Sequence, residues 1–109
     1  MKPVIVKVPV EEIHDWDSFH TVFTELMGFP DFYGRNMNAW IDCMGDLDSM
    51  TKFRDAEESG LILDLGDCSE FAKRCAELFQ AVTDGVGFVN YRKIESGNKP
   101  VLLLSFYTH

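Results

Sequence analysis

Apolar residues recur along this chain with the two spacings that distinguish strands from helices. Near the N-terminus, a closely spaced set of β-branched residues predicts a strand suited to a buried parallel position: Val4, Ile5, Val6 and Val8. The apolar run 61–65, bounded by Gly60 and Gly66, predicts a second strand. Between these runs, apolar residues at helical spacing predict a helix: Phe19, Val22, Phe23 and Leu26.

This predicted helix has clear signals at both ends. Asp15 or Asp17 is placed to cap its N-terminus, and Gly28 is the residue type that most often follows a helix. Trp16, beside the capping position, is expected to pack at the entrance to the helix rather than to bind a ligand.

The C-terminal half predicts a long helix followed by a hairpin. Ser69 or Asp67 is expected to cap a helix that Gly85 ends, with an apolar stripe formed by Phe71, Cys75, Leu78, Phe79 and Val82. A Ser-Gly-Asn turn then joins an antiparallel edge strand to a strand buried on both faces and parallel to the first two: 86–94 and 101–106. The pattern therefore predicts one α/β domain over residues 1–109, with helices on a small, mostly parallel sheet and an extra C-terminal antiparallel hairpin strand.

The stretch 29–47 organises the rest of the chain. Pro30 prevents the preceding helix from continuing, and the aromatic pair Phe32-Tyr33 is expected to pack the connection. Gly34 provides a backbone position without the constraint of a Cβ atom, and Asn36 is expected to cap a short helix from Met37 to about Met44. One face of this helix is apolar, with Met37, Trp40, Cys43 and Met44, and another face carries Asn38, Ile41, Asp42 and Gly45. The second face, with an exposed branched residue beside an amide and a carboxylate, is either a solvated surface or a binding surface.

Net charge changes this picture by favouring a basic partner. Ten basic and 18 acidic residues give 10 − 18 = −8, which argues against binding to nucleic acid or to an anionic membrane. The alternative explanation is that the acidic charge only keeps the protein soluble. Cys43, Cys68 and Cys75 form no Cys-x-x-Cys motif, and Cys43 and Cys75 are expected to be small buried hydrophobic residues, so a reducing, cytoplasmic location is expected.

Candidate catalytic chemistry is weak. Acids gather at Asp31, Asp42, Asp46 and Asp48, but such groupings arise by abundance among 18 acids, and no hydrolase or nucleotide-binding motif occurs. The histidines near the first helix match no metal-ligand spacing. We therefore expect no enzyme activity, no metal and no cofactor.

The run Phe-Pro-Asp-Phe-Tyr-Gly-Arg-Asn-Met-Asn-Ala-Trp-Ile-Asp-Cys, residues 29–43, resembles the signature of the barstar family of bacterial ribonuclease inhibitors. The resemblance is densest there and loose beyond Phe79. It implies a protein that blocks a basic ribonuclease active site in a 1:1 complex, and that is a monomer when free. The segment from Gly45 to Gly60, where Ser49 is expected to cap a turn over 51–56, is longer than the family pattern and is expected to reshape the binding edge.

The resemblance also implies site residues. The central acidic anchor falls on Asp42, with a recognition tyrosine replaced by Phe32, an aspartate by Asn38 and a tryptophan by Ile41, while Trp40 matches a core position. The full set of candidate partner-binding residues is Phe32, Tyr33, Gly34, Asn36, Met37, Asn38, Ile41, Asp42, Gly45 and Asp46. An acidic contact on the last family helix has no firm match and falls on Gln80 or Ala81.

Two functions remain open from the sequence. The first is an immunity protein that inhibits a bacterial toxin ribonuclease. This ribonuclease would differ from the one that the best-known barstar inhibits. The second is a barstar-fold module that regulates another basic protein or neutralises a toxin with a different activity.

Overall fold

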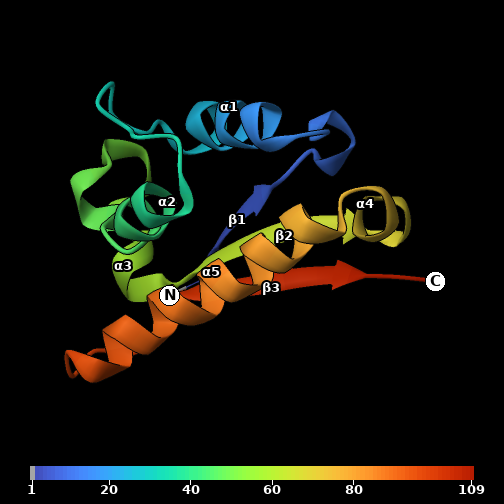
Figure 1. Cartoon of the computed structure of the whole chain (residues 1–109). Coiled ribbons are helices and arrows are strands. Elements are labelled where there is room, and N and C mark those ends of the chain that lie inside the picture. The colour runs from blue at the N-terminus through green and yellow to red at the C-terminus, as the bar shows by residue number, and fades with distance from the viewer. Residues whose placement is uncertain (1) are drawn as a thin grey trace.

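A computed structural model describes residues 2–109 and contains a three-stranded parallel sheet with strand order β1-β2-β3 (Figure 1). The strands are β1 (Val4–Lys7), β2 (Leu61–Asp67) and β3 (Leu102–Tyr107). The helices are α1 (Trp16–Met27), α2 (Met37–Met44), α3 (Ala56–Ser59), α4 (Ser69–Arg74) and α5 (Ala76–Glu95). The predicted α/β class with a small parallel sheet is confirmed.

Local sequence signals account for α1. Asp15 is the N-cap: its carboxylate accepts a hydrogen bond from the Ser18 backbone N–H at 2.8 Å, and the Ser18 hydroxyl interacts in return with the Asp15 backbone N–H. Gly28 ends the helix with a φ of 70°, a left-handed conformation that glycine adopts without strain. Trp16 is the first helical residue and stacks on His20, with ring centroids 5.9 Å apart.

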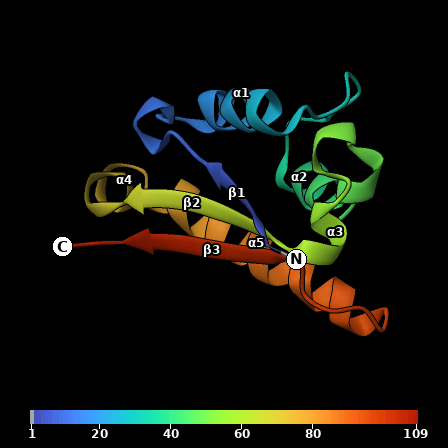
Figure 2. The same ribbon diagram turned by 180° about the vertical axis from the view of Figure 1, so that it is seen from behind.

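The sheet is covered on one side. Helix α5 lies along one face, and the view from behind shows β2 and β3 running in front of it with no helix over them (Figure 2). Ile5, Ile62 and Leu103 are in register across the three strands, and Ile5 and Leu103 are exposed. The prediction that β3 is buried on both faces is therefore wrong, because β3 is an edge strand with only one covered face.

The predicted C-terminal hairpin is also wrong. Residues 86–94 form the second half of α5, and Gly85 lies inside that helix rather than at its end. Val82, Val86 and Val89 are buried at helical spacing, so the same apolar stripe continues past the glycine. The Ser-Gly-Asn turn does exist, with Gly97 at a φ of 82°, but it joins α5 to the parallel strand β3.

Gly85 is a glycine because of what lies against it. A Cβ atom at this position would stand 2.6 Å from Cζ3 of Trp40, closer than real side-chain carbons approach one another. Trp40 is fully buried and comes from α2, which packs against α5. The residue taken as a helix stop is therefore the contact point between two helices.

This contact gives a prediction with a matched control. Gly85→Ala should destabilise the protein by about 1–3 kcal/mol, because overpacking against Trp40 exceeds the gain in helix propensity. Gly87→Ala, on the same helix with nothing within 4 Å of its added carbon, should instead stabilise it by about 0.5–1 kcal/mol. Urea denaturation of both variants measures the difference, and equal shifts in the same direction would contradict the packing argument.

The predicted helix after β2 is interrupted. The helical conformation is interrupted at Cys75, between α4 and α5, where the φ of −132° and the ψ of 48° are not helical. Cys68 occupies the N-cap position of α4, although it makes no side-chain cap bond. The Asp67 carboxylate accepts a hydrogen bond from the Ser69 backbone N–H at 2.9 Å, so it supports the start of the helix from one residue further back.

The long connection between α2 and β2 is ordered by burial. It contains two short 3-10 turns, 47–49 and 51–53, followed by α3. Its apolar side chains are anchored in the core: Leu47, Met50, Phe53 and Ala56. Ser49 does not cap the turn at 51–53, because its hydroxyl donates to the Asp46 carbonyl oxygen at 2.9 Å.

Candidate functional site

The loop before α2 is pinned to α1. The Arg35 guanidinium donates to the Asp17 carboxylate at 2.7 Å and lies 3.1 Å from the Thr21 hydroxyl. Arg35 has a φ of 53°, a left-handed conformation that costs energy for a residue with a side chain. As predicted, Asn36 caps α2, and its side chain accepts from the Ala39 backbone N–H at 2.8 Å. The start of α2 is therefore fixed before any partner arrives.

A second anchor joins this loop to the core. The Tyr33 hydroxyl lies 2.6 Å from Nδ1 of His20, which is buried on α1. Burial lowers the pKa of His20 and raises the pKa of the Tyr33 phenol, so both groups are neutral near pH 7. Tyr33 thus packs the connection as predicted and directs its hydroxyl inward. Phe32 does not pack it, because 86% of Phe32 is exposed.

The two faces of α2 differ as predicted, with two exceptions. Trp40 and Met44 are fully buried, while Asn38 and Asp42 are exposed. Ile41, expected to be exposed, is half-buried against the core, and Cys43, expected to be buried, is half-buried. The other expected buried thiol, Cys75, is buried.

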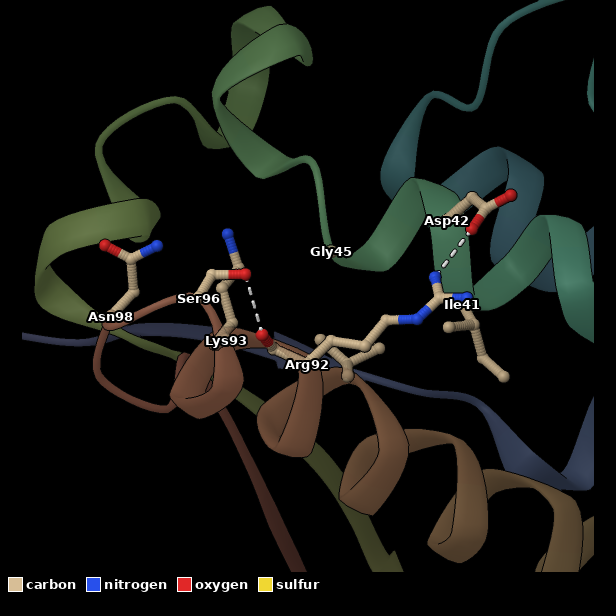
Figure 3. A pocket seen from close by; sticks show the side chains of 8 residues that line it. Ile41, Asp42, Gly45, Arg92, Lys93, Ser96 and Asn98 are labelled. Atoms are coloured by element: carbon tan, nitrogen blue, oxygen red, sulfur yellow. Dashed lines mark hydrogen bonds and ion pairs between the residues drawn. The ribbon is translucent and has the colours of Figure 1, made fainter.

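Asp42 forms an ion pair that the sequence did not predict. Arg92 extends from α5 across to α2, and its Nη1 donates to Oδ1 of Asp42 at 2.8 Å (Figure 3). Both side chains remain more than half exposed. They border a hollow of about 210 Å³ between α2 and the end of α5, lined also by Ile41, Gly45, Val89, Lys93, Ser96 and Asn98.

A smaller hollow lies on the other side of Asp42. It measures about 160 Å³ and is lined by Pro30, Phe32, Asp42, Cys43, Asp46, Ser49 and Met50. Its floor is mostly apolar, and two carboxylates stand among the lining residues. Ser49 and Met50 belong to the long connection after α2, so this segment forms part of the surface around Asp42.

The surface around Asp42 includes the thiol of Cys43. Burial and the neighbouring acids Asp42 and Asp46 raise the pKa of the Cys43 thiol, which opposes formation of a reactive thiolate. Within residues 2–109, no three potential metal-ligating side chains come together. The same residues include no helix long and apolar enough to cross a bilayer.

Comparison with known proteins decides the family. Residues 4–91 of the 109-residue chain match the family described as Barstar (barnase inhibitor). This chain belongs to the barstar family. No curated protein matches it. The barstar family is a family of inhibitors rather than enzymes. The matched region includes β1, β2, the helices α1 to α4 and most of α5.

The barstar fold brings part of the predicted site together. Asp42 lines both hollows, and four other candidates line one or the other: Phe32, Ile41, Gly45 and Asp46. Gly34 and Asn38 are exposed nearby in sequence, and Met37 is half-buried. Tyr33 and Asn36 serve mainly to hold the loop and to cap α2.

The α5 residue that meets Asp42 is not one of the two α5 positions considered for partner contact, Gln80 and Ala81. Gln80, a candidate for the acidic contact, is hydrogen-bonded to Asp84 and lies about 18 Å along α5 from Arg92 at 1.5 Å per residue. The α5 side chain that meets Asp42 is basic. Sequence reasoning missed Arg92 because residues 86–94 were interpreted as a strand. The signal that would have found it is the helical spacing of Val82, Val86 and Val89.

Proposed function

We propose that this protein is the inhibitor of a bacterial ribonuclease toxin and protects the cell that makes it. Asp42 carries the proposal: an exposed carboxylate on a fixed helix, between two hollows that a partner's side chains can enter. Family membership supports the same conclusion.

The mode of action follows from charge. A ribonuclease active site must be basic, because it binds a phosphodiester and stabilises developing negative charge. A carboxylate on a rigid helix takes the place of a phosphate through charge-assisted hydrogen bonds and offers no bond to cleave. The anchored loop and the capped helix reduce the entropy lost on binding, since Arg35 and Asn36 already hold them in place. We therefore expect inhibition by occlusion of the active site in a 1:1 complex.

Ribonuclease inhibition tests this proposal directly. The purified protein is titrated into barnase and a panel of other secreted bacterial ribonucleases while RNA cleavage is followed. We expect at least one enzyme to be inhibited, with an end point of one inhibitor per enzyme. Full activity of every enzyme at micromolar inhibitor would overturn the proposal.

A second candidate function is the neutralisation or regulation of a basic protein that is not a ribonuclease. Three substitutions at implied contact positions favour it: Phe32, Asn38 and Ile41 differ from the residues that the family pattern places there. Such a partner would bind through the same surface around Asp42. Tight binding to a basic protein with no effect on RNA cleavage distinguishes this candidate from the first.

The net charge of −8 predicts how association depends on salt. An acidic inhibitor and a basic cleft attract each other at a distance, and salt screens this attraction. The association rate constant should therefore fall as ionic strength rises, while the dissociation rate constant changes less. Stopped-flow mixing from low to high salt measures both constants, and an association rate that is flat across this range would contradict electrostatic steering.

A further inference from the structure

Arg92 is held in place from two sides. Its guanidinium donates to Asp42 at 2.8 Å and lies over the ring of Phe88, one helical turn earlier, at 5.0 Å from the ring centroid. Moving the side chain away would lose both contacts. Both contacts favour a position of the guanidinium beside Asp42 in the free protein.

Most of the hydrogen-bonding capacity of Arg92 is unused. A guanidinium has five N–H donors in a planar fork, and among residues 2–109 its one side-chain partner is Asp42. Its side chain is 56% exposed, so the remaining donors are accessible from solvent. Lys93, the next basic residue, is already paired with Glu57 at 2.9 Å and is mostly buried. Arg92 is thus the cation that this hollow presents to a partner.

A uniformly basic partner does not suit this arrangement. Arg92 already offsets the charge of Asp42, and a complex would bury the guanidinium next to the cation that Asp42 attracts. Asp42 would then be the single counter-ion of two buried cations, and burying a cation whose charge is only partly offset is costly. A carboxylate on the partner removes this cost, because it matches the planar fork of the guanidinium.

We infer that Arg92 is a second charged contact of the recognition surface and binds an acidic side chain of the partner, next to the basic group that binds Asp42. The partner surface then carries a basic group opposite Asp42 and an acidic group opposite Arg92. This inference rests on the proposed function. Arg92 itself lies just beyond the matched region, which ends at residue 91.

Affinity for the inhibited ribonuclease of the panel tests the inference. Arg92→Gln should weaken binding by about tenfold or more, because the partner's carboxylate loses its counter-ion. Lys73→Gln is the matched control: it removes the same charge from α4, at the opposite end of the molecule from α2 (Figure 1). Lys73→Gln should change affinity by less than about twofold, since it alters only the long-range field.

A double-mutant cycle separates contact from positioning. In a protein that already carries Asp42→Ala, Arg92→Gln should still weaken binding severalfold if Arg92 contacts the partner. Disappearance of the effect in this background would mean that Arg92 acts only by orienting Asp42, and would overturn the inference. Thermal unfolding of each variant checks that the fold is retained.

The outcomes also separate this inference from the proposed function. Unchanged or tighter binding by Arg92→Gln overturns the inference alone, provided that Asp42→Ala still weakens inhibition. Loss of affinity in both single variants, together with a persistent effect in the double variant, supports both.

Discussion

Replacing Asp42 by alanine should weaken binding to the inhibited ribonuclease by about 2–5 kcal/mol, the usual cost of removing one partner of a buried charge pair. The change removes charge-assisted hydrogen bonds and leaves the partner's cations buried without a counter-ion. Isothermal titration or an inhibition assay at limiting enzyme measures the loss.

Folding should hardly respond to the same substitution. Asp42 and Arg92 form an exposed ion pair, and such pairs contribute about 0–1 kcal/mol to stability. We therefore expect a change of about 0.5 kcal/mol in the free energy of unfolding. Unchanged ribonuclease affinity in Asp42→Ala would place the recognition surface elsewhere, most simply on the connection 45–60.

Asn38→Asp is the companion variant. It adds a carboxylate one turn before Asp42, on the same exposed face of α2. Binding should become tighter if the partner groove offers a cation at that place. Weaker binding would indicate an acidic or apolar partner surface opposite residue 38, and would show that this position selects a different target from that of the type member.

Trp40→Ala should destabilise the domain by about 3–5 kcal/mol, because it deletes the largest fully buried side chain. Trp40 lies edge-on to Phe23 of α1 at 5.5 Å between ring centroids, and rests on Gly85 of α5. Removing it leaves a cavity where α1, α2 and α5 meet. Urea denaturation followed by circular dichroism measures the loss.

Trp40→Phe is the control for this effect. It keeps an aromatic ring and removes an indole N–H that is buried with no hydrogen-bond partner among the described residues. We expect a clearly smaller loss than for alanine, since less volume is removed and an unsatisfied donor disappears. Equal losses in the two variants would mean that ring packing is not what Trp40 contributes.

The N-terminal half of the fold was predictable because its signals are local. Asp15, Gly28 and Asn36 each end or begin a helix through contacts within a few residues. The buried side of α2 followed from helical spacing alone, as the burial of Trp40 and Met44 confirms. In the C-terminal half, the parallel pairing of β3 was the part that was predicted correctly.

The C-terminal half was mispredicted because the reason for a glycine at position 85 is a contact with a residue distant in sequence. Gly85 looks like a helix end in sequence, whereas its cause is Trp40, 45 positions earlier in the chain. That error turned the second half of α5 into a strand and hid Arg92. An ion pair between residues 50 positions apart leaves no trace in local periodicity, so the charge character of the candidate site required the structure.

Trp40 and Asp42 stand two positions apart on α2, about 200° around the helix axis, so one faces the core and the other faces solvent. If the proposed function holds, substitutions on the solvent side change what is recognised and leave the Trp40–Gly85 contact untouched. Such a protein could then acquire new targets at little cost to its folding. The same separation makes positions 38, 42 and 92 suitable for randomisation in libraries selected against chosen toxins.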